Sequence, residues 1–226
     1  LLLPLKHVIL SAVYQIQVPD SVPEDTSGCC LYIDMGSDHL SFTVLNKTEG
    51  EFIALQHFNL EKNNGVSHTR EIIEHSEWLR KAYGHTVVVY NFSESILAPE
   101  KFYLADLNEQ SLELVYGDAH KGELFADHIP EWGLYHIYRV PAALHDALSG
   151  YFRNARFSHL YTCLLKTAKQ NPSYKVDCDE LYTVFYNNKL IVSLLKTGEL
   201  QLLRSFEYET AEDVVYYLLN ICKQYG

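Results

Sequence analysis

A pattern that occurs twice is the feature of this 226-residue sequence that most constrains its fold. Three short runs rich in leucine, β-branched and aromatic residues precede one amphipathic run. Runs separated by short turns predict antiparallel strands, and apolar spacing of three and four residues predicts the helix after them. The predicted strands are residues 31–35, 39–46, 51–59, 181–186, 189–195 and 199–208, and the predicted helices are residues 67–83 and 211–225. This strand, strand, strand, helix order indicates an internal duplication.

The two copies also align residue by residue. Residues 31–40 meet residues 181–190 without a gap. With two extra residues in the first copy's second turn, the alignment matches two later pairs, Gly50 with Gly198 and Phe58 with Phe206. Chance is the alternative, because all hairpins share alternation and turn residues. The helix that follows each set of strands favours duplication.

The rest of the chain supplies further predicted elements. Residues 14–28 contain two prolines, acidic residues and a glycine, so we expect an extended or loose segment. The other predicted elements are strands at 86–90, 96–99 and 133–139 and helices at 100–104, 141–152 and 160–169. The predicted organisation is a lead-in at 1–30, a first half at 31–140 and a second, shorter half at 141–226. The predicted fold class is α/β, with mixed sheets and flanking helices.

Composition narrows the possible partners and the compartment. The formal net charge of −11 argues against nucleic-acid binding, which needs clustered Lys and Arg. Five cysteines without Cys-x-x-Cys spacing are typical of free thiols in a reducing compartment. No apolar run approaches about 18 residues, the length that a membrane helix needs. We therefore expect a cytoplasmic protein without a membrane span.

Several stretches resemble an uncharacterised family of Bacteroidetes proteins, domain of unknown function 3822. They are residues 40–45, 52–55, 96–99, 204–207 and 215–219. The resemblance covers about residues 31–226 and is most specific at 198–225. It implies an actin-like ATPase fold of the ribonuclease-H-like superfamily, whose plan is a duplicated three-stranded meander with a helix, and it implies no assigned activity.

Asp34, Gly36 and Ser37 form the candidate nucleotide-binding loop. They lie in an Asp-Met-Gly-Ser sequence at the first predicted strand-to-strand turn. Actin-like ATPases place an Asp-x-Gly-Ser/Thr loop there, whose backbone amides hold phosphate and whose Asp orients metal-bound water. Glycine allows the close approach, and the amides and hydroxyl supply donors. An ordinary Gly-Ser turn at a strand end is the alternative.

The second half lacks the matching loop. A working site in this superfamily needs a second Asp-x-Gly loop at the equivalent position, where this sequence has Val184 and Tyr186. A tyrosine side chain would block the space that glycine opens. The alignment therefore predicts a vestigial site at Asp34, Gly36 and Ser37, with no bound cofactor.

Two other groups of polar residues are weaker candidates for a metal site. His68, Glu71 and His75 share one face of the first predicted helix, but such sites normally recruit a ligand from another element, so we expect a solvated face. The second group has no EF-hand or zincin spacing and is interpreted as an acidic loop. It consists of Asp118, His120, Glu123, Asp127 and His128.

The last predicted helix has a start signal and an apolar face. Thr210 and Asp213 have the spacing of a capping box. The residues expected on the buried face are Val214, Val215, Leu218, Ile221 and Cys222.

These observations favour a non-catalytic binding or scaffolding module with a protein partner. Known scaffolds that reuse the actin fold provide the analogy. The alternative is a divergent ATP-binding ATPase or phosphotransferase that uses the Asp34-Gly36-Ser37 loop.

Overall fold

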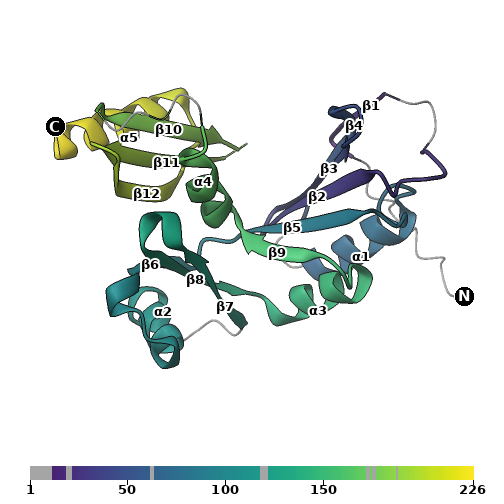
Figure 1. The fold of residues 1–226 in the computed structure, drawn as a ribbon, viewed down its shortest axis with the longest axis horizontal. Coiled ribbons are helices and arrows are strands. Elements are labelled where there is room, and N and C mark those ends of the chain that lie inside the picture. The colour runs from purple at the N-terminus through teal and green to yellow at the C-terminus, as the bar shows by residue number, and fades with distance from the viewer. Residues whose placement is uncertain are drawn as a thin grey trace, which may run out of the picture. The chain divides into compact units, whose positions relative to one another are not determined.

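The computed structural model describes residues 12–18, 22–61, 64–117, 122–171, 174, 177–186 and 188–226. The chain divides into two compact units (Figure 1). The first contains the residues up to His128 together with Leu134–Cys163, and the second contains Ile129–Gly133 and Leu164–Gly226. The predicted limits of the two actin-like halves, at 31–140 and 141–226, remain a prediction, because compactness alone does not define a structural repeat.

A six-stranded mixed sheet forms the centre of the first unit, with strand order β1-β4-β3-β2-β5-β9. Its strands are β1 (Tyr14–Gln17), β2 (Cys29–Gly36), β3 (His39–Asn46), β4 (Glu51–Asn59), β5 (His85–Asn91) and β9 (Arg156–His159). Strands β1 to β4 pair antiparallel, whereas β5 pairs parallel with both β2 and β9. The valine-rich run of β5 is typical of a buried parallel strand. The predicted antiparallel strands and the predicted strand at 86–90 are confirmed.

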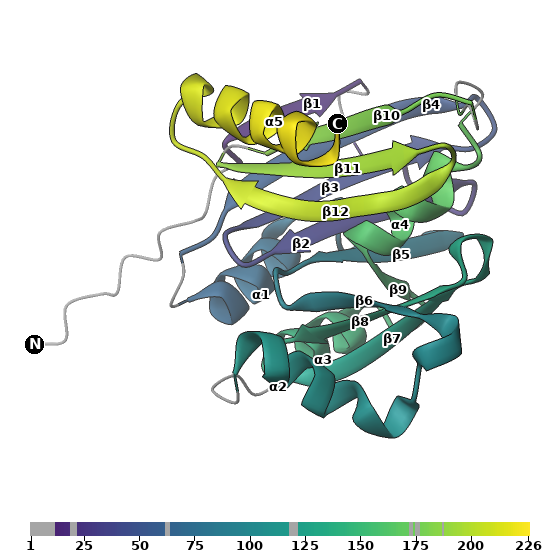
Figure 2. The ribbon, with the colours of Figure 1, turned by 90° about the vertical axis from the view of Figure 1, so that its left-hand side faces the viewer.

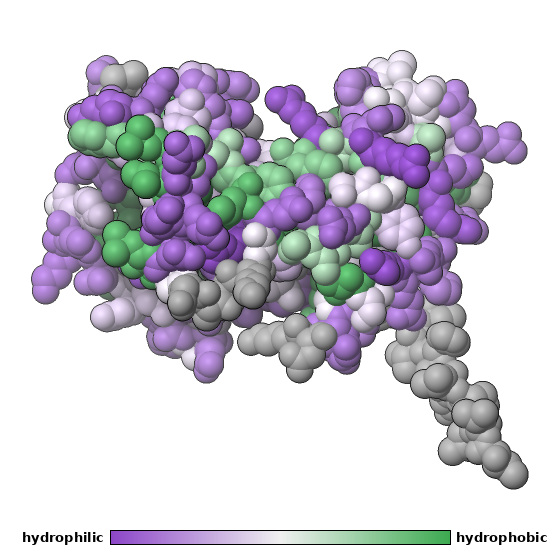
Figure 3. All heavy atoms as spheres, turned by 90° about the horizontal axis from the view of Figure 1, so that it is seen from below, coloured by the Kyte–Doolittle hydropathy of each residue, from purple (hydrophilic) through white to green (hydrophobic). Residues whose placement is uncertain are grey.

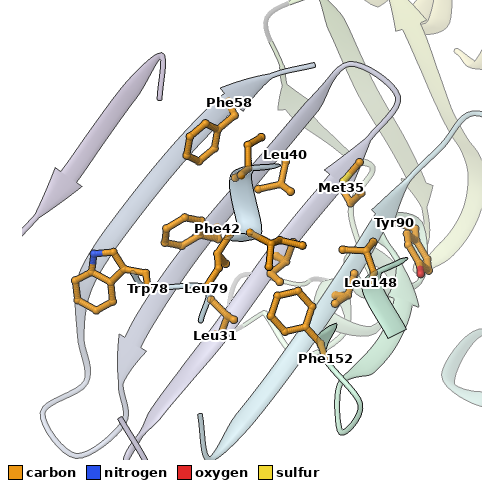
Figure 4. Packing of buried hydrophobic residues seen from close by; sticks show 14 of the residues in the cluster. Leu31, Met35, Leu40, Phe42, Phe58, Trp78, Leu79, Tyr90, Leu148 and Phe152 are labelled. Atoms are coloured by element: carbon orange, nitrogen blue, oxygen red, sulfur yellow. The ribbon is translucent and has the colours of Figure 1, made fainter. Parts of the chain in front are cut away.

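Two helices, α1 (Gly65–His75) and α3 (Ala142–Tyr151), pack on one face of this sheet. Alternation along β2 directs Leu31, Ile33 and Met35 to that face. Figure 4 shows the packing of the buried residues in this cluster. The labelled side chains are Leu31, Met35, Leu40, Phe42, Phe58, Trp78, Leu79, Tyr90, Leu148 and Phe152.

Helix α1 is shorter than predicted, and the expected end at residue 83 is wrong. Ser76 leaves the helix with extended backbone, φ −79° and ψ 120°. Its hydroxyl oxygen accepts a hydrogen bond from the backbone N–H of Leu79 at 3.3 Å. Such local bonds compete with helical hydrogen bonds. Trp78 and Leu79 are still buried, but a turn positions them.

Strand β1 lies in the segment that the sequence predicts to be extended or loose, and it takes the extended form. Backbone hydrogen bonds join Val13 N–H to His57 O at 2.7 Å and Val18 N–H to Ile53 O at 3.0 Å. All four β1 residues are exposed. Pairing along the edge of β4 therefore orders this strand without burying its side chains.

The first unit also contains a three-stranded sheet of order β6-β8-β7. Its elements are β6 (Ser95–Pro99), the short helices η1 (Glu100–Phe102) and η2 (Ala105–Leu107), α2 (Asn108–Tyr116), β7 (Glu123–Ile129) and β8 (Leu134–Val140). The predicted strands at 96–99 and 133–139 are confirmed. The prediction of an acidic loop is wrong from Glu123 onward, because these residues form strand β7. Asp118 and His120 of the predicted loop lie outside the described residues.

The second unit is a three-stranded antiparallel sheet with helix α5 (Ala211–Tyr225) on one face (Figure 2). Its strands are β10 (Glu180–Phe185), β11 (Lys189–Lys196) and β12 (Glu199–Glu207). The chain enters this unit through α4 (Leu160–Ala168), and η3 (Pro130–Trp132) also belongs to it. Among the helices that the structure describes, none is both long and apolar enough to cross a bilayer.

Helix α5 begins as predicted but buries a narrower face. Thr210 and Asp213 form a reciprocal capping box. Ile221 is buried, and Val214 and Leu218 pack against the same cluster. Val215 is 54% exposed, so its predicted burial is wrong, as is that of Cys222. One apolar stripe of the helix suffices to cover three strands. Val215 lies outside this stripe, because it is rotated about 100° around the helix axis from Val214.

The two three-stranded meanders share an irregular register. In β3 and β4 the pairing shifts between Val44 and Leu45, and in β11 and β12 it shifts between Leu194 and Leu195. These positions are equivalent in the sequence alignment of the two copies. Each meander therefore has a bulge at the same place, where one strand bends.

Candidate functional site

The three predicted loop residues lie at the carboxyl end of β2. Asp34 sits within the strand, paired with Ser41 of β3 and Val89 of β5. Gly36 ends β2, and Ser37 is exposed in the turn to β3. The structure thus brings these three residues to one end of the central strand.

The side chain of His39, the first residue of β3, packs directly over Gly36. A Cβ atom added to Gly36 would lie 2.4 Å from His39 Cε1 and 2.6 Å from Nδ1. His39 is only 6% exposed. Glycine is therefore needed at this position to accommodate an imidazole ring, since any side chain would collide with it.

Two carboxylates hold the His39 ring. Its Nδ1 lies 2.8 Å from Asp38 Oδ1, and its Nε2 lies 3.4 Å from Asp34 Oδ1. Burial opposes the charged form, but the hydrogen bonds and charges of Asp34 and Asp38 outweigh burial and raise the pKa of His39 to about 9. The imidazolium is consequently the form present at neutral pH.

A second histidine extends this polar row across the sheet. His57 of β4 pairs with Ser41, whose hydroxyl lies 2.6 Å from His57 Nδ1. Its ring stacks on Tyr14 of β1, with ring centroids 4.9 Å apart. Burial and the charge of His39 lower the pKa of His57. His39 and His57 were missed by sequence reasoning, although strand alternation, which puts Asp34 and His57 on one face, was a usable signal.

A cavity of about 550 Å³ adjoins the loop within the first unit. Its walls include the start of α1, where Asn64 is the N-cap residue without a side-chain capping bond. Arg70 lies one and a half turns further along this helix. The lining residues are Met35, Gly36, Ser37, Asn64, Gly65, Val66, Ser67, Arg70, Phe92, Pro141 and Leu144. Exposed helix N–H groups and a guanidinium can attract an anion.

The equivalent turn of the second unit has a different covering. Tyr186 N–H donates to Lys189 O at 2.8 Å and closes the turn. The Lys189 Nζ atom lies over the Tyr186 ring, 5.3 Å from its centroid. Val184, in the position of Asp34, pairs with Ile191 within β10 and β11. The second turn thus presents an aromatic ring and an ammonium group.

The weaker metal candidates have other roles. His75 Nδ1 lies 2.8 Å from Glu71 O within α1. Asp127 accepts hydrogen bonds from the hydroxyls of Tyr138, at 3.3 Å, and Ser158, at 2.9 Å, and so links three strands. Over the described part of the chain, no three His, Cys, Asp or Glu side chains are grouped to hold a metal ion.

Residues 21–226 match the model of a family described as "Protein of unknown function (DUF3822)". The chain belongs to this family. The match covers every element after β1, and the predicted resemblance to an uncharacterised family is confirmed. No protein with a curated description matches the chain.

One solved structure establishes the fold. A protein from Bacteroides thetaiotaomicron, with an actin-like ATPase fold and unknown function, is 16% identical and superposes with a TM-score of 0.76 over 88% of this chain and 77% of its own. This family member therefore has the actin-like ATPase fold, as predicted.

More distant matches have lower scores. A Ppx/GppA phosphatase from Aquifex aeolicus is 9% identical, with a TM-score of 0.39 over 87% of this chain and 62% of its own. The ethanolamine utilization protein EutJ from Carboxydothermus hydrogenoformans is 10% identical, with a TM-score of 0.39 over 91% of this chain and 60% of its own.

Proposed function

We propose that this protein is a non-catalytic binding module whose partner is another protein. The observation that carries the proposal is the buried His39 ring, which fills the space above Gly36 between Asp34 and Asp38. A phosphate at Gly36 would have to displace this imidazolium and approach two carboxylates. Both steps are unfavourable, because they uncover buried charge and bring like charges together. Asp34, Gly36 and Ser37 are accordingly proposed to be a vestigial nucleotide loop.

The second turn supports the same proposal. Tyr186 occupies the position equivalent to Gly36, and its backbone N–H already donates to Lys189. A turn whose amide is used internally and whose surface is a tyrosine ring has no free backbone for phosphate at that residue. The matching register of the two meanders supports the proposed duplication on which this comparison rests.

An apolar segment of the first unit supports protein as the partner class. Its five large side chains are between 47% and 88% exposed: Phe102, Leu104, Leu107, Leu114 and Val115. Figure 3 shows hydrophobic side chains on the face of the molecule that carries α2. Exposed apolar groups gathered in this way mark protein contact sites. Residues 100–116 contain four acidic residues and one lysine, so the complementary partner is an apolar surface flanked by basic residues.

The second candidate function is the divergent ATPase or phosphotransferase, and one observation favours it. The 550 Å³ cavity beside Gly36 and Ser37 also receives the start of α1 and Arg70. Ligands of open α/β sheets bind outside the carboxyl ends of the strands, where this cavity lies. An anion that avoids Asp34 and Asp38 could still be held by Ser37 and Arg70.

Crosslinking tests the protein-binding proposal. A photoreactive residue at position 114 is compared with one at position 216, since Leu114 and Tyr216 are both exposed apolar residues on helices, at 88% and 65%. We expect one protein to crosslink from position 114, and its purified form to bind wild type but to bind Leu114→Arg at least tenfold more weakly. Equal crosslinking from both positions, or unchanged affinity of Leu114→Arg, would contradict the proposal.

A phosphate-release assay with Mg–ATP separates the two functions. The proposal predicts no release above the buffer rate. Turnover by wild type that disappears in both Asp34→Asn and Arg70→Ala would establish the enzyme instead. Tyr216→Ala serves as the control variant, because Tyr216 lies on the exposed face of α5.

A further inference from the structure

A second cavity in the first unit, of about 500 Å³, lies at the opposite end of β2 from the Gly36 loop. It is formed around the amino ends of β2, β5 and β9, whereas Gly36 ends β2. The polar residues among those that line it include Tyr32, Lys47, His85, Thr86, Asn154 and Arg156. None of these residues belongs to the site described above.

Strand register explains why three of these residues, Tyr32, His85 and Arg156, share one face. Cys30 pairs with His85, Tyr32 pairs with Val87, and Val87 pairs with Arg156. Residues that pair directly across strands point to the same side of a sheet. This side is opposite to the helix-covered core, because alternation sends Leu31 to α1 and α3.

Lys47 joins the group from the neighbouring strand. It follows β3, and its backbone N–H donates to Gly28 O at 3.2 Å, two residues before Cys30. Its position is therefore in the row next to the one that contains Cys30 and His85. Lys47 and Arg156 both line this cavity, so a ligand that fills it can contact both side chains.

The charge of this cavity contrasts with that of the whole chain. The chain has a net charge of −11, yet the cavity is lined by Lys47, Arg156 and His85 and by no carboxylate. Within the described residues, none of these three side chains pairs with an acidic group. These three nitrogen donors, from β5, β9 and the turn after β3, line one cavity.

The wall of the cavity at Gly84 is fixed by close packing. A Cβ atom at Gly84 would lie 2.2 Å from Ser27 O. The Thr26 hydroxyl, which is 3% exposed, donates to Ala82 O and ties this turn to the segment before β2. The backbone next to His85 is consequently preorganised, which lowers the cost of binding.

We propose that this cavity binds a small phosphate ester. Arg156 supplies a planar fork suited to two phosphate oxygens, and Lys47 supplies a compact ammonium. The Tyr32 hydroxyl and the Asn154 amide add donors, and the volume leaves room for the organic part of the ligand. This inference is independent of the proposed protein-binding function, because the two use different residues.

Calorimetric titration with glycerol phosphate, at constant ionic strength, tests this inference. We expect one site, weakened at least tenfold in Arg156→Ala and in Lys47→Ala. Arg153→Ala is the matched control, since Arg153 is also exposed but does not line the cavity, and its affinity is expected to stay within twofold of wild type. Circular dichroism confirms that each variant is folded.

Three results would overturn the inference. Absence of binding at millimolar glycerol phosphate is the first. Equal weakening by Arg153→Ala and Arg156→Ala is the second, because it indicates general charge attraction. The third is binding that is lost in Arg70→Ala and retained in Arg156→Ala, which assigns the phosphate to the cavity beside Ser37.

Discussion

The hairpin of β2 and β3 and the hairpin of β10 and β11 share a backbone plan but have different turns. In both, the first residue of the second strand folds back over the turn, as His39 does over Gly36 and Lys189 does over Tyr186. The bulge also occurs at equivalent positions. Register is therefore the shared property, and it depends on apolar alternation, which a change of turn residues leaves intact.

The two hairpins differ in how deeply their first strands are buried. β2 lies inside a six-stranded sheet, between β3 and β5, and most of its residues are buried. β10 is an edge strand, and none of its residues is fully buried. The first hairpin can consequently enclose a charged cluster, whereas at the turn of the second a cation lies over an aromatic ring.

Truncation of core side chains should have the largest effect on the free energy of unfolding. It should also test whether the two hairpins contribute equally to stability. Leu40 and Leu190 occupy equivalent positions and are both 0% exposed. Replacing either by alanine should lower the free energy of unfolding by about 2 to 5 kcal/mol. Denaturant titration measures this, with exposed Val215→Ala as the control, expected within about 0.5 kcal/mol. A negligible cost at Leu190 alone would break the equivalence.

The pH dependence of stability should isolate the charged cluster of the first hairpin. Because the pKa of His39 rises to about 9 on folding, its contribution is complete below the unfolded pKa of about 6.5 and is lost as the pH rises to 9. The expected loss is at most about 3 kcal/mol. Unfolding titrations at several pH values should show this slope in wild type and a flatter one in His39→Gln. Identical slopes would contradict the assignment.

The Gly36→Ala substitution should produce a smaller loss that depends on His39. The new methyl group must move the ring from Asp34 and Asp38, at a cost of about 1 to 2 kcal/mol. In a His39→Ala background the same substitution should cost much less, because the ring is absent. A double-mutant cycle measures this coupling, and additive effects would show that Gly36 and His39 are independent.

Much of this fold could be predicted from sequence, because alternation and turn residues fix local structure. The meanders, β5, α3 and α4 follow this rule. The pairing of strand β1 could not be predicted, because its partner β4 is distant in the sequence. The side chains of β1 are exposed and therefore give no burial pattern. The exposure of Val215 could not be predicted either, because it depends on how much of the α5 surface a three-stranded sheet can cover.

The sequence predicted where the candidate site lies in the chain, but it did not predict that His39 would pack over the loop. Asp34, Gly36 and Ser37 form a recognisable local sequence. The role of His39 depends on its rotamer and on Asp34, which approaches it from another strand. Side-chain placement of this kind is a tertiary property that no short sequence pattern contains.

Nucleotide binding by wild type is the most direct test of the account. Thermal unfolding is measured with and without Mg–ATP, Mg–ADP and Mg–GTP at millimolar concentration. A ligand at about 100 times its dissociation constant would add about 2.7 kcal/mol of stability and raise Tm by several degrees. We predict no shift, because His39 occupies the space above Gly36 and Tyr186 covers the second turn. A clear increase in Tm that disappears in Asp34→Ala and in Gly36→Val would contradict this account and favour the ATPase.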